Sequence, residues 1–435
     1  MNRSITTRLV KLVSLALLLI LVIMPFHEFL TTWAASNFGH LDVWRIWKEI
    51  VIALCLPVVF YLIWINPKLN KWLKTDWLFW LIIAYVILSL GLGFWSYKTG
   101  RVNKNALADG LITDLRFPVF FGAALVVASY SDFIKKHWQP IVLIPAALVV
   151  IFGLAQLILS LNFLSHFGYG ANTIPAYSLV NLNLHYRRIQ STLRGANPLG
   201  VYLILIIPAL FIRLKDKFYY RLIMIILAAL AMFFTYSRSA YLGLIVTLIS
   251  LYYLLWLTDK WRRKFLVGCA VLAALAVIAV VGLRYNQVAD NIFFHTSNNS
   301  KSAQSSNAQH VSAFETGLKQ VYHQPLGAGP GTAGPASVHN NHPARIAENY
   351  YIQIAQELGV AGLVIFLAIN FLVAKRLLAN RADPLAALLL ASFIGISLAN
   401  LIEHAWADDT ISLIWWGLAG VALAPAIIKR ERKPA

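Results

Sequence analysis

The sequence predicts an all-α integral membrane protein with about twelve transmembrane helices and a long extracytoplasmic loop that contains short helices. Three observations predict this class. Hydrophobic residues make up 59% of the 435 residues and charged residues only 13%, whereas soluble domains are about 25% charged. The mean hydropathy is +0.67. Apolar runs long enough to cross about 30 Å of hydrocarbon recur along the whole chain.

These apolar runs define the expected elements in order. We expect membrane spans at residues 12–30, 46–65, 77–95, 106–130, 141–161, 198–212, 222–237, 240–257, 265–283, 350–374, 384–404 and 411–428. The first run follows three basic residues, but eleven further runs come after it, so we expect a retained anchor and not a cleaved secretory signal. The chain is therefore predicted to form one polytopic membrane domain over residues 1–435, with an extracytoplasmic loop at 284–349 between the ninth and tenth helices.

The basic residues follow the expected topology. Lys and Arg number 37 against 18 acidic residues, which gives a net charge of +19, and in a soluble chain this excess would indicate a nucleic-acid partner. With the N-terminus in the cytoplasm, the short loops after the second, fourth, sixth, eighth and tenth runs all carry Lys or Arg and all face the cytoplasm. The positive-inside rule accounts for most of the charge, so we expect no nucleic-acid partner.

The cysteines and histidines give no metal-binding pattern. Cys55 and Cys269 both fall inside predicted helices, where cysteine behaves as a small hydrophobic residue. Several histidines lie in the long loop, but their spacing matches no recognised ligand pattern and no Asp-x-Asp occurs in the chain; they are His295, His323, His339 and His342. We therefore expect no metal ion and no cofactor.

The second half of the long loop carries three signals. Apolar residues at helical spacing in HVSAFETGLKQVYHQP predict a short amphipathic helix. The glycines of PLGAGPGTAGPAS either bring backbone N–H groups near an anion or serve a loop that needs positive φ angles. Glu348 and Asn349 then stand at the mouth of the bundle, where the next helix begins. Residues 296–309, which precede the predicted amphipathic helix, have almost no apolar side chains and are predicted to form a mobile tether.

Several stretches, taken in order, resemble the O-antigen ligase and O-antigen polymerase superfamily. RIQSTLRGANPLGVYL at 188–203 resembles an Arg-rich segment that enters a helix through Asn-Pro, and TYSRSAYLGL at 235–244 resembles a Thr-x-Ser-Arg element. PLGAGPG at 325–331 resembles a Pro-x-x-Gly-x-Gly turn, and ENYYIQIAQELGVAGL at 348–363 resembles an Asn-x-Tyr helix. The resemblance extends to the final pair of helices around EHAWADDT at 403–410.

The resemblance implies a membrane glycosyltransferase of the GT-C type in the bacterial cytoplasmic (inner) membrane, with its active site facing outside. Such enzymes move an oligosaccharide or polysaccharide from an undecaprenyl diphosphate carrier to an acceptor lipid, glycan or protein, by an inverting, metal-independent displacement. Two positions indicate a divergent subgroup. His310 stands where relatives usually carry an arginine, and Glu348 stands where they usually carry a histidine.

The site residues follow from this resemblance together with their chemistry. Arginine suits the growing negative charge of a diphosphate leaving group, so Arg238, Arg188 and Arg194 are the candidate diphosphate ligands. The alternative is that Arg238 snorkels to the interface and the other two bind anionic lipids nonspecifically.

His310 and Glu348 are the candidates for the base that activates the acceptor hydroxyl, and the sequence leaves open which of them takes the proton. In the alternative interpretation, His310 caps a surface helix and Glu348 is an acidic residue of a first helical turn. Asn349, His404 and Asp408 are possible acceptor-site residues. The polar group of Glu403, His404 and Asp408 is expected to form either a helix cap and gate or part of acceptor recognition.

A secondary transporter of a small anion is the rival function, because about twelve helices is also a common count among transporters. A transporter should place polar residues near the middle of the membrane and show two related halves. Here the polar residues collect at one face, and no internal repeat is apparent. A third possibility is an inactive scaffold, which would tolerate the loss of Arg238, His310 and Glu348 together.

Overall fold

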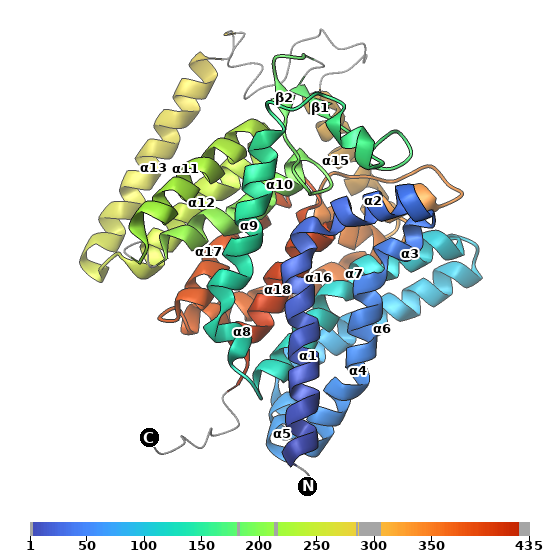
Figure 1. Ribbon diagram of the computed structural model, residues 1–435. Coiled ribbons are helices and arrows are strands. Elements are labelled where there is room, and N and C mark those ends of the chain that lie inside the picture. The colour runs from blue at the N-terminus through green and yellow to red at the C-terminus, as the bar shows by residue number, and fades with distance from the viewer. Residues whose placement is uncertain (1–2, 181–182, 213–215, 284–285, 287–305, 426–435) are drawn as a thin grey trace.

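The computed structural model describes residues 3–180, 183–212, 216–283, 286 and 306–425, and nearly all of the regular structure in these ranges is helical (Figure 1). Eight helices in this part of the chain are long and apolar enough to cross a membrane, and three shorter apolar helices accompany them. The prediction of an all-α membrane protein is therefore supported. The exact number of twelve spans stays a prediction.

The first third of the chain forms one side of the molecule in Figure 1, drawn in blue and cyan. Its elements are α1 (Arg3–Ile23), η1 (Met24–Phe26), α2 (His27–Phe38), α3 (Leu41–Arg45), α4 (Trp47–Ile65), α5 (Pro67–Thr75), α6 (Trp77–Lys98) and α7 (Lys104–Ala128). The first apolar run was expected to be one span over residues 12–30. It is instead divided by η1, where Pro25 lies in the 3-10 turn between α1 and α2.

The middle of the chain forms the opposite side, with α11, α12 and α13 outermost and α9 between them and α1 (Figure 1). Its elements are α8 (Phe133–Lys136), α9 (Trp138–Ala155), η2 (Phe163–Phe167), β1 (Ser178–Leu179), β2 (Arg187–Arg188), α10 (Ala196–Phe211), α11 (Phe218–Thr235), α12 (Arg238–Leu255) and α13 (Asp259–Gly282). The two short strands pair antiparallel, with Ser178 opposite Arg188.

The C-terminal helices fill the space between the two sides. They are α15 (Ser306–His323), η5 (Pro335–His339), α16 (Tyr350–Ala379), α17 (Pro384–Ala399), η6 (Ala405–Ala407) and α18 (Asp409–Leu423). The closest packing joins α12 to α17 and α18 to α7. Trp415 and Trp416 of α18 are fully buried, so α18 is part of the core that holds the two sides together.

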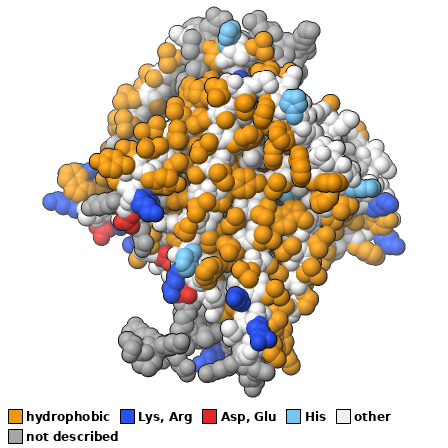
Figure 2. Space-filling model, in the orientation of Figure 1, with side chains coloured by type: hydrophobic (Ala, Val, Ile, Leu, Met, Phe, Trp, Pro, Cys, Tyr) orange, Lys and Arg blue, Asp and Glu red, His pale blue; other side chains and the backbone are white. Residues whose placement is uncertain are grey.

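The outer surface is that of a protein surrounded by lipid. In Figure 2 the centre of the face is almost continuously hydrophobic, and lysine and arginine side chains appear near its margins. Many large apolar side chains on α4, α6 and α13 are exposed, among them Trp64, Phe94 and Leu272. An exposed apolar surface of this extent is suited to hydrocarbon and not to water.

Asparagine and aspartate caps begin many of the helices. Asn66 accepts hydrogen bonds from two backbone N–H groups at the start of α5, and Asp76, Asn103, Asp383 and Asp408 cap α6, α7, α17 and α18 in the same way. Each cap satisfies N–H groups that have no partner within the helix. The polar boundaries between apolar runs therefore fix where the helices start.

The amphipathic helix predicted in the long loop is confirmed as α15, and it begins at Ser306, inside the stretch expected to be a tether. Residues 296–305 of that tether lie outside the described ranges. The glycine-rich turn that follows α15 docks into a break in α16 at Gly359, where φ is +72°. Ala328 and Gly329 donate their N–H groups to the carbonyls of Gln356 and Glu357, both at 2.8 Å.

Two further hydrogen bonds join this turn to α16. The N–H of Gly331 donates to the carboxylate of Glu357 at 2.7 Å, and the N–H of Val360 donates to the carbonyl of Pro325 at 2.9 Å. Of the two interpretations of the glycines, positive φ is the one observed, at Gly327, Gly329, Gly331 and Gly334. The N–H groups of Ala328, Gly329 and Gly331 are all used by α16, so these three are not available to a bound anion.

Asp76→Ala should lower stability by about 2–3 kcal/mol, because it removes a helix cap and the carboxylate of a partly buried ion pair. Arg376 of α16 contacts both oxygens of Asp76, at 2.7 and 2.5 Å, and the Asp76 side chain is only 4% exposed. The melting temperature of the detergent-solubilised protein, followed by size-exclusion chromatography, measures the loss.

Asp383→Ala is the matched control for Asp76→Ala. Asp383 also caps a helix and pairs with a lysine, Lys135, but both of these side chains are substantially exposed. We expect a loss of about 1 kcal/mol, mostly from the cap. Equal losses in the two variants would contradict the importance of the Asp76–Arg376 pair.

Candidate functional site

The junction between α11 and α12 positions Arg238. α11 ends at Thr235, Tyr236 follows in the left-handed region with φ of +50°, and Arg238 is the first residue of α12. Gly200 of α10 packs against this junction so closely that a Cβ there would lie 2.6 Å from the Cβ of Ala240. The sharp reversal and the close packing together hold Arg238 at the rim of the bundle.

Arg188 is held in the same place from a distant part of the sequence. It lies in β2, and its Nε donates to the carbonyl of Thr235 at 2.8 Å. Its Nη2 donates to Oδ1 of Asn197 at the start of α10. Two hydrogen bonds from one guanidinium fix its orientation, so this arginine is preorganised next to the α11–α12 junction.

A pocket with a cavity volume of about 390 Å³, partly open to solvent, lies where these elements meet. We call it the arginine pocket, and it is lined by Arg188, Asn197, Tyr236, Ser237, Arg238, Ser239, His310, Val311, Ile402 and Glu403. It therefore brings together two of the three predicted diphosphate ligands and one of the two predicted bases. Its size is in the range typical of ligand sites.

Glu403 also lines this pocket, whereas the sequence analysis considered it only as part of a polar group that serves as a helix cap and gate or in acceptor recognition. Its Oε1 accepts a hydrogen bond from the hydroxyl of Ser239 at 2.9 Å. Burial raises the pKa of Glu403 to about 7, although Ser239 and Arg188 act in the opposite direction. A carboxyl group that titrates near neutral pH is suited to accept a proton in catalysis.

His310 and Glu348 are in contact, a pairing that the sequence analysis considered. Nδ1 of His310 in α15 contacts Oε2 of Glu348, which precedes α16 and has a φ of +51°. The hydrogen bond from His310 lowers the pKa of Glu348, against the opposing effect of burial. Because Nδ1 is engaged by the carboxylate, Nε2 is the ring nitrogen through which His310 can take a proton.

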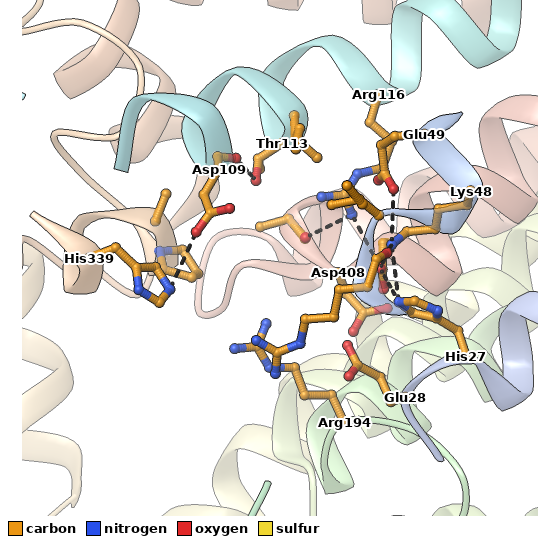
Figure 3. Close-up of a pocket in the computed structure, with 17 residues that line it drawn as sticks. His27, Glu28, Lys48, Glu49, Asp109, Thr113, Arg116, Arg194, His339 and Asp408 are labelled. Atoms are coloured by element: carbon orange, nitrogen blue, oxygen red, sulfur yellow. Dashed lines mark hydrogen bonds and ion pairs between the residues drawn. The ribbon is translucent and has the colours of Figure 1, made fainter. Parts of the chain in front are cut away.

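Arg194 and Asp408 lie in a second pocket, not with Arg188 and Arg238. This pocket, which we call the mixed-charge pocket, has a cavity volume of about 130 Å³ and is drawn in Figure 3. Its charged and polar lining consists of His27, Glu28, Arg45, Lys48, Glu49, Asp109, Thr113, Arg116, Arg194, His339, Asp408 and Asp409. The three arginines predicted to converge on one diphosphate are thus divided between two pockets.

Asn349 and His404 have buried positions between these features. The side chain of Asn349 caps α16 through Ile352 and donates to the carbonyl of Leu401 at 3.0 Å, so both of its polar groups serve the fold. The ring nitrogens of His404 are buried and have no hydrogen-bond partner within the described residues. Burial lowers the pKa of His404 to about 4, which keeps the ring neutral at pH 7.

One group of side chains in the mixed-charge pocket has the composition of a metal site. Ligand atoms of His27, Glu28 and Asp409 lie within 4.8 Å of one another. However, Nζ of Lys48 lies 2.9 Å from Asp409 and 3.0 Å from Nε2 of His27. The lysine ammonium therefore already supplies the positive charge at this point.

Residues 222–367, about a third of the chain, match a family model described as O-antigen ligase. The matched region runs from α11 to the first part of α16, so it contains Arg238, His310 and Glu348, whereas Arg188 and Glu403 lie outside it. No curated protein matches the chain. Together with the apolar helices, the family match supports a multi-pass membrane protein with a glycosyltransferase-like function.

Proposed function

We propose that this chain transfers a glycan from undecaprenyl diphosphate to an acceptor outside the cytoplasmic membrane of a bacterium. The match of residues 222–367 to the O-antigen ligase family model supports this proposal. The acceptor is a lipid, a glycan or a protein. The observation that carries the proposal is the arginine pocket, in which Arg188 and Arg238 come from distant segments and lie beside a titratable carboxyl group.

The two arginines suit the leaving group of this reaction. When the bond between the anomeric carbon and the diphosphate oxygen breaks, the diphosphate keeps the electron pair and its negative charge grows. Guanidinium groups bind phosphate oxygens at two points and stay charged at any physiological pH. Arg188 is held by two hydrogen bonds before the substrate arrives, and the start of α12 places Arg238 at the same pocket. Little reorganisation is then needed to stabilise this charge.

The acceptor hydroxyl supplies the other half of the reaction. Its oxygen attacks the anomeric carbon from the side opposite the diphosphate, which inverts the configuration, and its proton must pass to a base. Glu403 and the His310–Glu348 pair are both close enough to the pocket for this role. We favour Glu403, because its pKa of about 7 allows it to be deprotonated before the reaction and to accept a proton during it.

A reconstituted assay tests the proposal. The donor is the lipid extract from membranes of a strain that lacks this protein, and the acceptor is the envelope fraction of the same strain. Purified wild-type protein in liposomes should convert the lipid-linked glycan into a transferred product. If it leaves the extract unchanged but moves a small anion at a rate that depends on a proton or sodium gradient, the transporter interpretation replaces the proposal.

The pH dependence of transfer should identify the base. If Glu403 accepts the proton, the wild-type rate should rise as pH increases through about 7, because the carboxyl group must be deprotonated, and should fall about tenfold per unit well below that value. Glu403→Gln should lose most of the rate and the inflection near pH 7. Initial rates of transfer are measured in the reconstituted assay from about pH 5 to about pH 9, with the donor at a saturating concentration at every pH.

Glu315→Gln is the control for Glu403→Gln. Glu315 is an exposed carboxylate on α15 that lines neither of the two pockets, so its removal should leave the profile unchanged. An inflection that persists in Glu403→Gln and disappears in His310→Ala would instead make His310 the base.

A further inference from the structure

The mixed-charge pocket is built from many separate parts of the chain. His27 and Glu28 come from the start of α2, Lys48 and Glu49 from α4, and Asp109 and Arg116 from α7, with further residues from η5 and the start of α18. Figure 3 shows their side chains directed towards a common space. Because the lining of the mixed-charge pocket comes from so many elements, its side chains are held in place by the packing of the whole fold.

The deepest charges of this pocket neutralise one another. Asp409 pairs with Lys48 at 2.9 Å and with His27 at 3.2 Å, and Arg116 lies 4.0 Å away. Lys48 also pairs with Glu49 at 3.4 Å, and the Lys48 side chain is only 4% exposed. These groups therefore form the wall of the pocket, and their charges are satisfied without a bound ion.

The tautomer of His27 argues further against a metal ion. Trp47 donates its Nε1–H to Nδ1 of His27 at 2.9 Å, and because indole nitrogen is a donor only, Nδ1 must be the acceptor. Neutral His27 then carries its proton on Nε2, which faces Asp409 and Lys48. Neither ring nitrogen has a lone pair directed at an empty metal position.

Besides Oε2 of Glu49, which pairs with Lys48, two buried polar atoms of the lining have no hydrogen-bond partner among the described residues. Oε2 of Glu28 is one, although Glu28 is only 5% exposed, and Nε of Arg116 is the other. In Figure 3 the Glu28 carboxylate lies beside Arg194 and Asp408 and faces the open part of the pocket. An unpaired buried acceptor and an unpaired buried donor each cost free energy unless a ligand or water completes them.

The charges of the lining select among ligand classes. A diphosphate would meet the carboxylates of Glu28, Asp408 and Asp409, and a cation would meet Arg116 and Arg194. Sugar hydroxyl groups both donate and accept hydrogen bonds, so different hydroxyl groups of one sugar can serve the acceptor of Glu28 and the donor of Arg116. A neutral, hydroxyl-rich ligand carries no charge for these side chains to repel, so it is the ligand class that fits the lining best.

The two pockets share two short segments of chain. Residues 402–409 contribute Glu403 to the arginine pocket and Asp408 to the mixed-charge pocket, and residues 188–194 contribute Arg188 to the first and Arg194 to the second. Glu403 interacts electrostatically with Asp408, which in turn interacts with Glu28 and Arg194. A molecule anchored in one pocket therefore has the other pocket as its neighbour.

From these observations we propose that the mixed-charge pocket binds an uncharged sugar residue of one of the two glycan substrates, adjacent to the reacting centre. This inference rests on the proposed function for the identity of the ligand as part of a substrate. The sugar belongs either to the acceptor or to the transferred glycan of the donor. Both sources present the same hydroxyl groups, so two experiments are needed.

The first experiment measures binding without any transfer. Thr113 lines the pocket, so Thr113→Cys, in a protein with Cys55→Ala and Cys269→Ala, places a thiol there. We expect neutral methyl glycosides of hexoses and N-acetylhexosamines to slow modification of this thiol by a water-soluble maleimide, and sodium pyrophosphate and magnesium chloride not to slow it. A thiol introduced by Glu315→Cys, on the exposed face of α15, should react at the same rate in every condition.

Three results would overturn the inference. They are equal or stronger protection by pyrophosphate, equal or stronger protection by magnesium, and no protection by any glycoside. The result does not depend on transfer, so it stands even if the protein proves to have another activity.

The second experiment distinguishes the two sources of the sugar. With the lipid extract described above, transfer to the acceptor and release of glycan by water are measured in parallel for wild type, Glu28→Gln and Glu315→Gln. If the acceptor occupies the pocket, Glu28→Gln should reduce transfer at least tenfold and leave water-driven release unchanged. If the donor glycan occupies it, both rates should fall together.

A bulky variant guards against an effect of Glu28→Gln on folding. Thr113→Leu fills the pocket without changing a charge, and it should reproduce the pattern of Glu28→Gln. Wild-type rates in both variants would overturn the inference. Absence of both transfer and release in the wild type would instead count against the proposed function, and the thiol-protection result would still decide what the pocket binds.

Discussion

Arg238→Ala is expected to slow transfer about 100- to 1,000-fold, which is the range found when one preorganised donor to a developing negative charge is removed. Arg238 begins α12 at the wall of the arginine pocket, and no apolar core depends on its side chain. The variant protein should therefore accumulate normally in the membrane. The lipid-linked glycan should accumulate in cells, and the reconstituted rate should fall with it.

Arg238→Lys separates charge from geometry at this position. Lysine keeps the positive charge but lacks the planar fork, so it should restore only part of the rate. Arg187→Ala is the matched control, because Arg187 neighbours Arg188 in β2 but donates to the carbonyl of Leu159 at 2.7 Å and does not line the pocket. Wild-type transfer in a protein that carries both Arg238→Ala and Arg188→Ala would end the diphosphate assignment.

Gly331→Ala is expected to prevent accumulation of the folded protein. A Cβ at Gly331 would lie 2.0 Å from the carbonyl oxygen of Ala106 in α7, and its φ is +81°. The contact is with backbone on both sides, since Gly110 of α7 also meets the backbone of Gly331. Relief requires movement of the turn away from α7, with a cost of at least about 3 kcal/mol. Membrane yield and melting temperature are the measurements.

Gly122→Ala is the matched control for Gly331→Ala. Gly122 lies in the same helix that Gly331 approaches, and a Cβ there would meet nothing within 4 Å. Because alanine is the better helix former, this variant should be as stable as the wild type or more stable by up to about 1 kcal/mol. A Gly331→Ala protein with wild-type yield and melting temperature would show that the turn does not need its close approach to α7.

The helices could be predicted from the sequence wherever an apolar run ended at a polar capping residue. The run expected at 77–95 begins one residue after Asp76, and that expected at 384–404 begins one residue after Asp383, as α6 and α17 do. The break of α16 at Gly359 could not be predicted in this way. It depends on the turn at 325–331 docking into it, and a long-range contact leaves no periodic pattern in the sequence.

The same limit applies to the candidate site. The resemblance identified Arg188, Arg238, His310 and Glu348, and the fold brings all four to the arginine pocket or its rim. Arg194 is only six residues from Arg188, yet it lines the other pocket, because residues 188–194 run from one pocket to the next. Proximity in sequence therefore predicted a cluster of three arginines, whereas only two of them line the same pocket.

Glu403 was underestimated for the complementary reason. Its neighbours in the sequence are typical of a capping segment, and its role as a candidate base depends on Ser239, which is 164 residues away along the chain. The presence of an acidic residue, Glu403, shortly after α17 could be seen in the sequence, but its role as a base could not. Only the three-dimensional contact with α12 distinguishes it from the cap formed by Asp408.

The docking of the turn into α16 has a mechanical consequence for His310. α15 is tied to the membrane bundle at its C-terminal end by residues 325–331, while His310 lies 13 residues before His323, close to the other end. Between these ends, Gly317 packs against Ala347 and Ile352, and His310 itself contacts Glu348. The stretch from His310 to His323, about 20 Å at 1.5 Å per residue, is therefore held against the start of α16 along its length. The position of His310 relative to Glu403 is thus fixed from both ends of its helix.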